Sequence, residues 1–190
     1  MTQVEEHEGL ILPESYGEAD KEATVLDSSG REVSSNELPP LSDIVKGFVA
    51  GLAGGLAGTA AKSLAEQVFP PRSPERRSPP VVAVEMVTGE EVPEDKKELV
   101  QEAIHWPFGT LMGGAYGAVA EALPAATTGY GAAFGLTVLA TTHESTMPAL
   151  GITPAPTDMP AKEHVSELFS HTLYGVTTEL VRRTVRDLLD

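Results

Sequence analysis

The fold is decided by an uncharged run of fifteen residues, GFVAGLAGGLAGTAA, at Gly47–Ala61, in which ten residues are Gly or Ala. In a water-exposed helix its five glycines would each cost about 1 kcal/mol relative to Ala, about 5 kcal/mol in all. A soluble core would recover this cost with large side chains, which the run mostly lacks. In a bilayer, unsatisfied backbone groups are so costly that the helix forms whatever its propensity. The run therefore predicts a membrane-spanning helix.

Glycines spaced four residues apart recur in later segments of the chain. Residues four apart share one helix face, and small residues there let two helix backbones approach closely in a membrane. One such match is weak, whereas three in one chain favour a bundle packed through small residues. The glycines expected at helix contacts are Gly47, Gly51, Gly55 and Gly58, then Gly109, Gly113 and Gly117, then Gly131 and Gly135, and finally Gly175.

Four segments that are low in charge or amphipathic make up the predicted bundle. They span about 44–69, 104–123, 127–147 and 161–189. None shows the alternation of a half-buried strand. The predicted fold class is therefore all-α, a four-helix transmembrane bundle packed through GxxxG faces. Residues 70–103 are expected to form a polar, exposed loop, within which the apolar run Val81–Val87 predicts a small strand or an extended segment.

The first 43 residues have a different composition from the rest. They hold eleven acids and two bases, so they supply −9 of the net charge of −15. Such charge with little apolar content predicts a mostly disordered acidic tail, 1–43, ahead of a membrane domain, 44–190. An acidic chain also lacks the basic face through which proteins bind nucleic acid, so no nucleic-acid partner is expected.

The spans are short for a bilayer, which needs about 20 apolar residues. The uncharged runs are 47–61, 106–120 and 122–142. Lys62 is expected to extend its ammonium toward the headgroups. The last helix carries charges within its span, so it would insert only as part of the bundle, with its polar face turned inward.

Ionisable residues inside the spans are the candidates for a mechanism. Such residues in membrane helices are functional candidates by default, as ion sites or proton relays. The candidate polar site comprises His143, Glu144, His171, Glu179, His105 and Glu121, and Glu167 lies on the same face of the last helix as His171 and Glu179. We expect His143, Glu144, His171 and Glu179 to meet inside the bundle.

These polar residues also have a purely structural interpretation. Both histidines in that group could simply hydrogen-bond a neighbouring helix or carbonyl. Glu179 is expected to pair with Arg182 or Arg183 at a spacing of three or four. The sequence predicts a solvated anchor at the lipid headgroups, formed by Arg182, Arg183 and Arg186.

Catalysis is poorly supported by the sequence. The chain has no cysteine, which excludes disulfides, a thiolate nucleophile and every Cys-ligated metal site. Phosphate-binding loops, GxSxG elbows and HExxH motifs are missing, and so is the paired Glu-x-x-His of di-iron bundles. A haem between two histidines of the last two helices is geometrically conceivable. We expect no catalytic residue, no resident metal and no cofactor.

Motifs in all four segments resemble the YagU-like bacterial inner-membrane proteins, a domain family of unknown function. The resemblance covers about 44–187 and rests on Phe69–Arg72 after the glycine-rich helix, His105 and Gly113–Gly117, Gly135-Leu136, His143-Glu144 and Pro148–Gly151, then Ser170-His171, Leu173–Glu179 and Arg182-Arg183. It implies a multi-pass inner-membrane location and supplies no reaction.

Two functions remain open from the sequence. The first is a non-enzymatic membrane protein, an accessory subunit or a small ion- or proton-responsive bundle, whose partners are the lipid bilayer and either a larger membrane complex or further copies of itself. The second is a soluble or peripheral helical interaction module whose acidic tail binds a basic partner.

Overall fold

The computed structural model describes residues 24–26, 32–34, 38–73 and 75–190, and the chain divides into two units, 1–38 and 39–190. In the first unit, β1 (Thr24–Leu26) and β2 (Glu32–Ser34) pair antiparallel, although the sequence predicted no strand there. The prediction of disorder for the other tail residues up to 37 lies outside the described residues.

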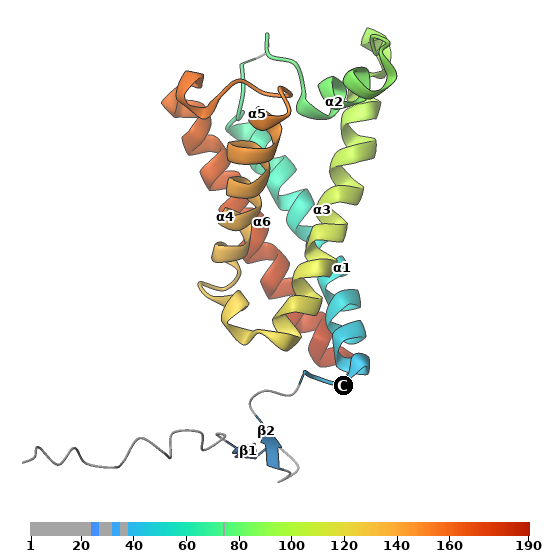
Figure 1. Cartoon of the computed structure of the whole chain (residues 1–190), viewed down its shortest axis with the longest axis vertical. Coiled ribbons are helices and arrows are strands. Elements are labelled where there is room, and N and C mark those ends of the chain that lie inside the picture. Colours follow the sequence, from blue (N-terminus) through green and yellow to red (C-terminus); the bar gives the residue numbers. More distant parts are fainter. Residues whose placement is uncertain (1–23, 27–31, 35–37, 74) are drawn as a thin grey trace, which may run out of the picture. The chain divides into compact units, whose positions relative to one another are not determined.

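The second unit is all-helical (Figure 1). Its long helices are α1 (Leu41–Val68), α3 (Lys97–Ala122) and α6 (Ala161–Leu188). A fourth, continuous helical segment, called the fourth rod below, is formed by α4 (Ala132–Thr141), a π-helical segment (Thr142–Thr146) and α5 (Met147–Ala149). The short α2 (Pro79–Thr88) lies at the same end of the bundle as α5. Single 3-10 turns occupy Glu94–Lys96, Pro124–Thr127 and Pro156–Asp158.

Proline and glycine set most helix boundaries. Pro40 and Pro160 immediately precede α1 and α6, and Pro70 follows the last turn of α1. These positions suit proline. Ahead of a helix, the missing N–H of proline costs no hydrogen bond, because the first N–H groups of a helix have no partner within it. After a helix, a proline prevents the helix from continuing. Gly131, with φ of +85°, begins α4, and a side chain there would meet the Gly175 carbonyl oxygen at 2.3 Å.

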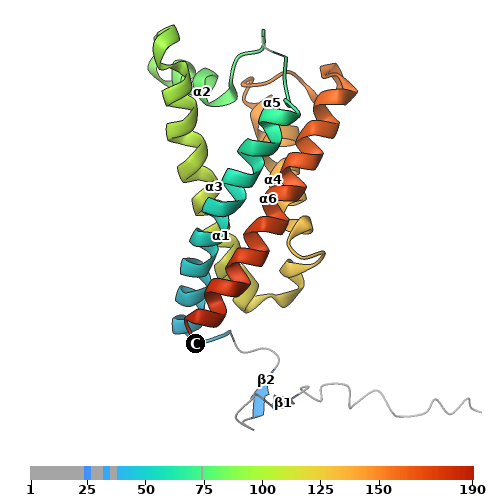
Figure 2. The same ribbon diagram turned by 180° about the vertical axis from the view of Figure 1, so that it is seen from behind.

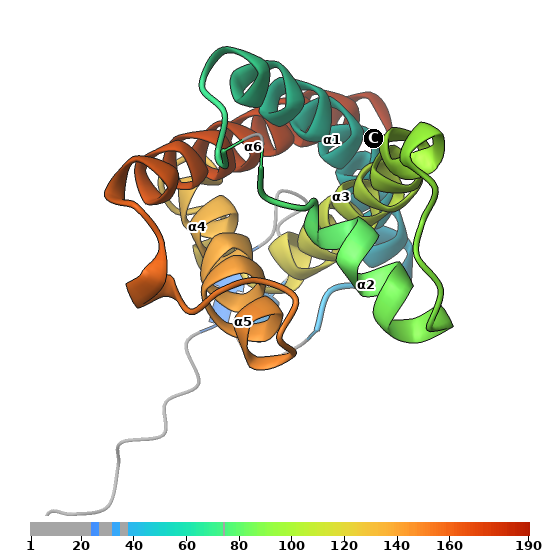
Figure 3. The same ribbon diagram turned by 90° about the horizontal axis from the view of Figure 1, so that it is seen from above.

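The predicted glycines lie where helices contact one another. Helix α1 packs on α3 and on α6, and α4 packs on α6, as seen from behind and from above (Figures 2 and 3). A Cβ placed on Gly51 would lie 2.2 Å from the Gly113 carbonyl oxygen, and one on Gly135 would lie 2.0 Å from the His171 carbonyl oxygen. Close backbone contacts of the same kind involve Gly47, Gly55 and Gly117 between α1 and α3, Gly58 between α1 and α6, and Gly175 opposite α4, while Gly109 meets Thr59. These glycines form contacts between helices of one chain, so their spacing is no argument that two chains associate.

The polar loop predicted over 70–103 is wrong in part. Residues 79–88 form α2, where the sequence predicted a strand or an extended segment at Val81–Val87, and α3 begins at Lys97, seven residues before the predicted 104. Prolines 79 and 80 occupy the first turn of α2, and Gly89, in the left-handed conformation, ends it. An apolar run this short cannot be assigned from periodicity alone.

The third predicted helix, 127–147, is shifted toward the C-terminus. A 3-10 turn and three residues with positive φ, Gly129–Gly131, precede α4, and the rod continues to Ala149. Glycines and a tyrosine in the left-handed conformation form a turn instead of helix.

Candidate functional site

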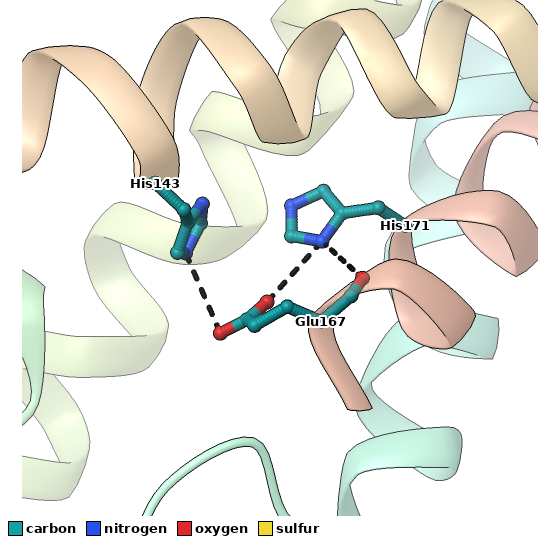
Figure 4. Close-up of side chains that lie close together, drawn as sticks. All are labelled: His143, Glu167 and His171. Carbon is teal, nitrogen blue, oxygen red and sulfur yellow. Dashed lines mark hydrogen bonds and ion pairs between the residues drawn. The ribbon is translucent and has the colours of Figure 1, made fainter. Parts of the chain in front are cut away.

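The site lies between the π-helical segment and α6. Pro148 has no N–H, and its ring would clash with a carbonyl in a regular helix turn. The wider turn before it is closed by the Met147 N–H, which donates to the Thr142 carbonyl. Turns of this kind change where side chains point and recur at functional sites. His143 is carried on this turn and faces α6 (Figure 4).

Two further members of the site lie one turn apart on α6. Glu167 and His171 are both buried, and His171 has 2% of its surface exposed. Nδ1 of His171 is 2.9 Å from the Glu167 carbonyl oxygen and 3.2 Å from Glu167 Oε2. Their spacing of four residues places both side chains on the face of α6 that meets α4.

The three side chains form a compact cluster, which we call the His–Glu–His cluster: His143, Glu167 and His171 (Figure 4). Nε2 of His143 is 3.9 Å from Glu167 Oε1. The two imidazole rings meet edge to face, with centroids 4.8 Å apart and planes at 71°. One potential ligand atom from each residue lies within 4.8 Å of those of the other two.

Lys62 of α1 stands beside this cluster. Its ammonium lies 3.8 Å from Glu167 Oε2 and is hydrogen-bonded to Glu66, one turn further along α1. Lys62 is 7% exposed, so the expectation that it reaches the headgroups is wrong. A buried carboxylate is available to it in the bundle, and a paired buried charge is far less costly than an unpaired one.

A cavity of about 180 Å³ adjoins the cluster. Its lining includes all three cluster residues, Lys62 and His105. A second cavity, of about 350 Å³, shares His143 and Glu167 with the first and is bordered by three arginines, Arg72, Arg76 and Arg77. Two of these arginines are paired, Arg76 with Glu163 and Arg77 with Glu85.

A second buried polar group lies toward the opposite end of α6 from the first. Glu179, fully buried, accepts hydrogen bonds from Tyr116 Oη at 2.8 Å and from Arg182 Nε at 2.7 Å, and Arg183 also donates to it. The predicted pairing of Glu179 with Arg182 or Arg183 is therefore confirmed, and both arginines take part. Arg182 is 7% exposed, so the solvated anchor is wrong for this arginine.

Of the six predicted site residues, the structure places His143 and His171 in the cluster. Glu144 lies one position beyond His143 and contacts His164 instead, with 3.2 Å between Oε1 and Nδ1. Glu179 belongs to the arginine group, where Glu121 also lies, 3.1 Å from Arg186 Nε. His105 lines the 180 Å³ cavity but is not a member of the cluster.

Two ionisable groups close to the ends of α6 have shifted pKa values. His164, in the first turn of α6, is hydrogen-bonded to the Pro156 carbonyl, which raises the pKa of its imidazole above the ordinary 6.5, and the Glu144 carboxylate adds to the effect. The Lys46 ammonium and the Arg186 guanidinium lower the pKa of the exposed Asp190 carboxyl, which ties the C-terminus to the start of α1.

The fold and the site define a class: a small all-helical bundle with charged and polar side chains inside and a His–Glu–His cluster between two helices. Residues 56–180, about two thirds of the chain, match the model of DUF1440, a family described as proteins of unknown function, and the chain belongs to this family. The matched region contains His105 and all three cluster residues. No curated protein and no solved structure matches the chain.

Proposed function

We propose that the chain is a multi-pass membrane protein of the inner membrane, and that it acts without catalysis as an ion- or proton-responsive bundle. The observation that carries the proposal is an inverted distribution of side chains. Charged and polar groups such as Lys62, Glu167, His171 and Glu179 are buried. Large aliphatic groups are exposed along the helices. A soluble protein places these two classes the other way round.

The exposed positions of the three long helices are apolar over 16 to 21 residues each. They are Val45, Val49, Leu56 and Leu64 within 44–64 of α1; Ala103, Ile104, Pro107, Phe108, Leu111, Ala115, Val119 and Ala122 within 103–122 of α3; and Val165, Leu168, Phe169 and Leu180 within 165–180 of α6. Exposing this much apolar surface to water is unfavourable, so another apolar phase or partner must cover it. Lipid can cover all sides of a helical bundle at once.

Helix α4 exposes hydroxyl groups, and its own backbone satisfies them. Thr137 donates to the Ala133 carbonyl at 2.8 Å, and Thr141 donates to the Thr137 carbonyl at 2.7 Å. A hydroxyl paired in this way presents mainly its methyl group outward, so its cost in hydrocarbon is small.

Among the described helices, α1 is the one that is long and apolar enough to cross a membrane by length and composition. Averaged hydropathy is low for α6, because its buried face carries Glu167, His171, Glu179 and Arg182. The proposed spans are 47–64, 104–123, 132–149 and 165–181, each about 25–30 Å long, which is close to the thickness of the hydrocarbon core. The resemblance to YagU-like proteins supports the inner membrane as the location.

The chain lacks cysteine, so single cysteines test the spans directly. Leu56→Cys and Leu111→Cys lie near the middle of two spans, and Phe169→Cys lies one turn inside a third; all three positions are exposed. Glu90→Cys is the matched exposed control outside the spans. In intact membranes a water-soluble maleimide should label the Glu90 variant alone, and detergent unfolding should expose the others. Labelling of all four, with release by alkaline carbonate, would instead favour the soluble module.

The ion or proton response needs its own test. In proteoliposomes, we expect a pH-dependent cation or proton flux that His143→Ala and His171→Ala reduce, while His105→Ala in the same cavity changes it less. If the wild-type chain carries no flux, the responsive role is wrong and an accessory, scaffolding role replaces it.

A further inference from the structure

We propose that the His–Glu–His cluster binds one divalent first-row transition-metal ion of the Zn²⁺ or Fe²⁺ class. This inference goes beyond the proposed function, because it holds whether or not the helices cross a bilayer. It rests on four features of the described residues: ligand geometry, the proton positions of both histidines, an unpartnered carboxylate oxygen, and access.

The ligand atoms are close enough to converge on one ion. Each residue of the cluster offers one atom within 4.8 Å of the other two. Around a tetrahedral Zn²⁺ with bonds of about 2.1 Å, ligand atoms lie roughly 3.4 Å apart. Side-chain rotations that shorten these separations by up to about 1.4 Å therefore complete the site. Two of the ligands are one turn apart on α6, which fixes their relative position before binding.

Hydrogen bonds place the proton of His143 on Nδ1. Nδ1 is 2.9 Å from Thr142 Oγ1, and that hydroxyl donates its own proton to the Val138 carbonyl at 2.6 Å. The hydroxyl can then only accept from the ring, so Nδ1 is the protonated nitrogen. Nε2 is left with a lone pair, and it is the nitrogen that faces the Glu167 carboxylate.

The proton of His171 is placed on Nδ1 in the same way. Nδ1 lies 2.9 Å from the Glu167 carbonyl oxygen, and a carbonyl can only accept. Nε2 is therefore the nitrogen available to an ion, and because the His171 ring contacts Glu167 through Nδ1, binding requires the Glu167 carboxylate to turn toward Nε2. A metal-bound histidine almost always donates its other N–H to a carbonyl, carboxylate or similar oxygen, which fixes its tautomer. Both histidines are held in the form that binds metal.

The carboxylate between them lacks a full set of partners. Glu167 Oε2 is buried and accepts no well-aligned hydrogen bond from the described residues: His171 Nδ1 is 3.2 Å away, but its proton is directed to the Glu167 carbonyl. Lys62 lies 3.8 Å from this oxygen, and its hydrogen bond goes to Glu66, whose charge balances it. A buried carboxylate facing the lone pair of a neutral imidazole is unfavourable unless a cation joins them. A metal ion satisfies all three groups at once.

Access and donor chemistry narrow the choice of ion. The cluster borders both the 180 Å³ and the 350 Å³ cavities, so an ion can enter and keep a coordination position open. Two imidazoles with one carboxylate suit Zn²⁺ and Fe²⁺, whereas Ca²⁺ and Mg²⁺ prefer oxygen ligands alone.

The test measures metal binding by the full-length chain, purified without an affinity tag in detergent. Every protein carries His7→Gln, because the tail run Glu5–Glu8 contains a histidine between acids. Zn²⁺ affinity is measured by competition with a chromophoric chelator, and Co²⁺ supplies a visible absorption spectrum that reports its ligands. We expect one Zn²⁺ per chain and a Co²⁺ spectrum typical of mixed nitrogen and oxygen ligation.

Variants separate the cluster from its surroundings. Glu167→Gln, which is isosteric, and His171→Asn should each weaken Zn²⁺ binding by at least about a hundredfold, and Thr142→Val should weaken it roughly 10–100-fold by removing the acceptor for His143. His105→Gln is the matched control and should change affinity less than about threefold. Far-UV circular dichroism checks that each variant is folded.

Two results would overturn the proposal. One is a folded wild-type chain that binds neither Zn²⁺ nor Co²⁺ at millimolar concentration. The other is a Glu167→Gln variant that binds as tightly as the wild type, or no more weakly than His105→Gln. Both readouts are independent of cysteine labelling in membranes, so failure of the metal site and failure of the membrane assignment can be told apart.

Discussion

Two adjacent glycines of α3 provide a controlled test of the helix packing. A Cβ on Gly113 would lie 2.4 Å from the Gly55 Cα and 2.6 Å from the Gly51 carbonyl oxygen, both backbone atoms of α1. A Cβ on Gly114 would lie 2.8 Å from Leu52 Cδ2, the far end of a flexible side chain. Alanine at either position should gain about 1 kcal/mol of helix propensity, so this gain cancels when the two variants are compared.

The difference between the variants can be estimated from the contacts. Ordinary van der Waals contact begins near 3.4 Å. For Gly113→Ala, α1 and α3 must therefore separate by about 1 Å, and overpacking of this kind costs roughly 1–3 kcal/mol. For Gly114→Ala, the atoms in the way belong to the side chains of Leu52 at 2.8 Å and Phe48 at 2.9 Å, which can rotate at less cost than a backbone can move. We expect the Gly113→Ala variant to be about 1–3 kcal/mol less stable than the Gly114→Ala variant.

Unfolding in mixed detergent micelles can measure this difference. The single tryptophan, Trp106, lies on α3 and reports its unfolding by fluorescence, while circular dichroism follows the helices as a whole. Both probes should give the same midpoint for each variant. If Gly113→Ala is as stable as Gly114→Ala or more so, the close packing of α1 on α3 is wrong.

Three further predictions concern the charges and the metal. Glu179→Ala removes the closest ion pair of the buried Arg182, which keeps only a 3.5 Å contact with the Glu121 carboxylate, and should cost about 3–5 kcal/mol of unfolding free energy, whereas Glu121→Ala should cost about 1 kcal/mol or less, because the Glu121 side chain is partly exposed. The raised pKa of His164 means that its contribution to stability is fully present below about pH 6.5 and is lost as the pH rises through the folded-state value. The difference in thermal midpoint between the wild type and His164→Gln should therefore be larger at pH 5.5 than at pH 8.5; an equal difference at both would contradict the assigned hydrogen bond to Pro156. Zn²⁺ at a hundred times its Kd should add about 2.7 kcal/mol to the free energy of unfolding, and a chelator should reverse this; an unchanged midpoint would argue against the metal site.

The helices that the sequence predicts best are those bounded by proline. Pro40 and Pro70 bracket α1, and Pro160 precedes α6, so the predicted bounds differ from the observed ones by three residues or fewer. The glycine spacing also indicates which faces pack together, because only small residues permit such close approach. Helix α2 escaped prediction, since ten residues with several β-branched side chains fit a strand as well as a helix.

The site is predictable only in part, because its geometry depends on contacts between helices. His143 and His171 were expected to meet, and they do so through the wide turn before Pro148. Glu144 follows His143 directly, about 100° around the helix, so it points elsewhere. Glu179 lies eight residues beyond His171, about 12 Å along α6, which is too far to join the same cluster. Lys62 could be placed in the site only once α1 was seen to pack on α6.

Helix α6 explains why averaged hydropathy understates the apolar surface of this bundle. One of its faces buries Glu167, His171, Glu179 and Arg182, and the opposite face exposes aliphatic and aromatic side chains such as Phe169. In water, that outer face would be a costly exposed apolar surface. In lipid the same arrangement is favourable, because the charges pair with one another inside while the apolar face meets hydrocarbon. If the chain spans the membrane as proposed, substituting a charge for Phe169 should reduce the membrane-bound fraction more than Glu167→Gln does, although both changes alter one residue of the same helix.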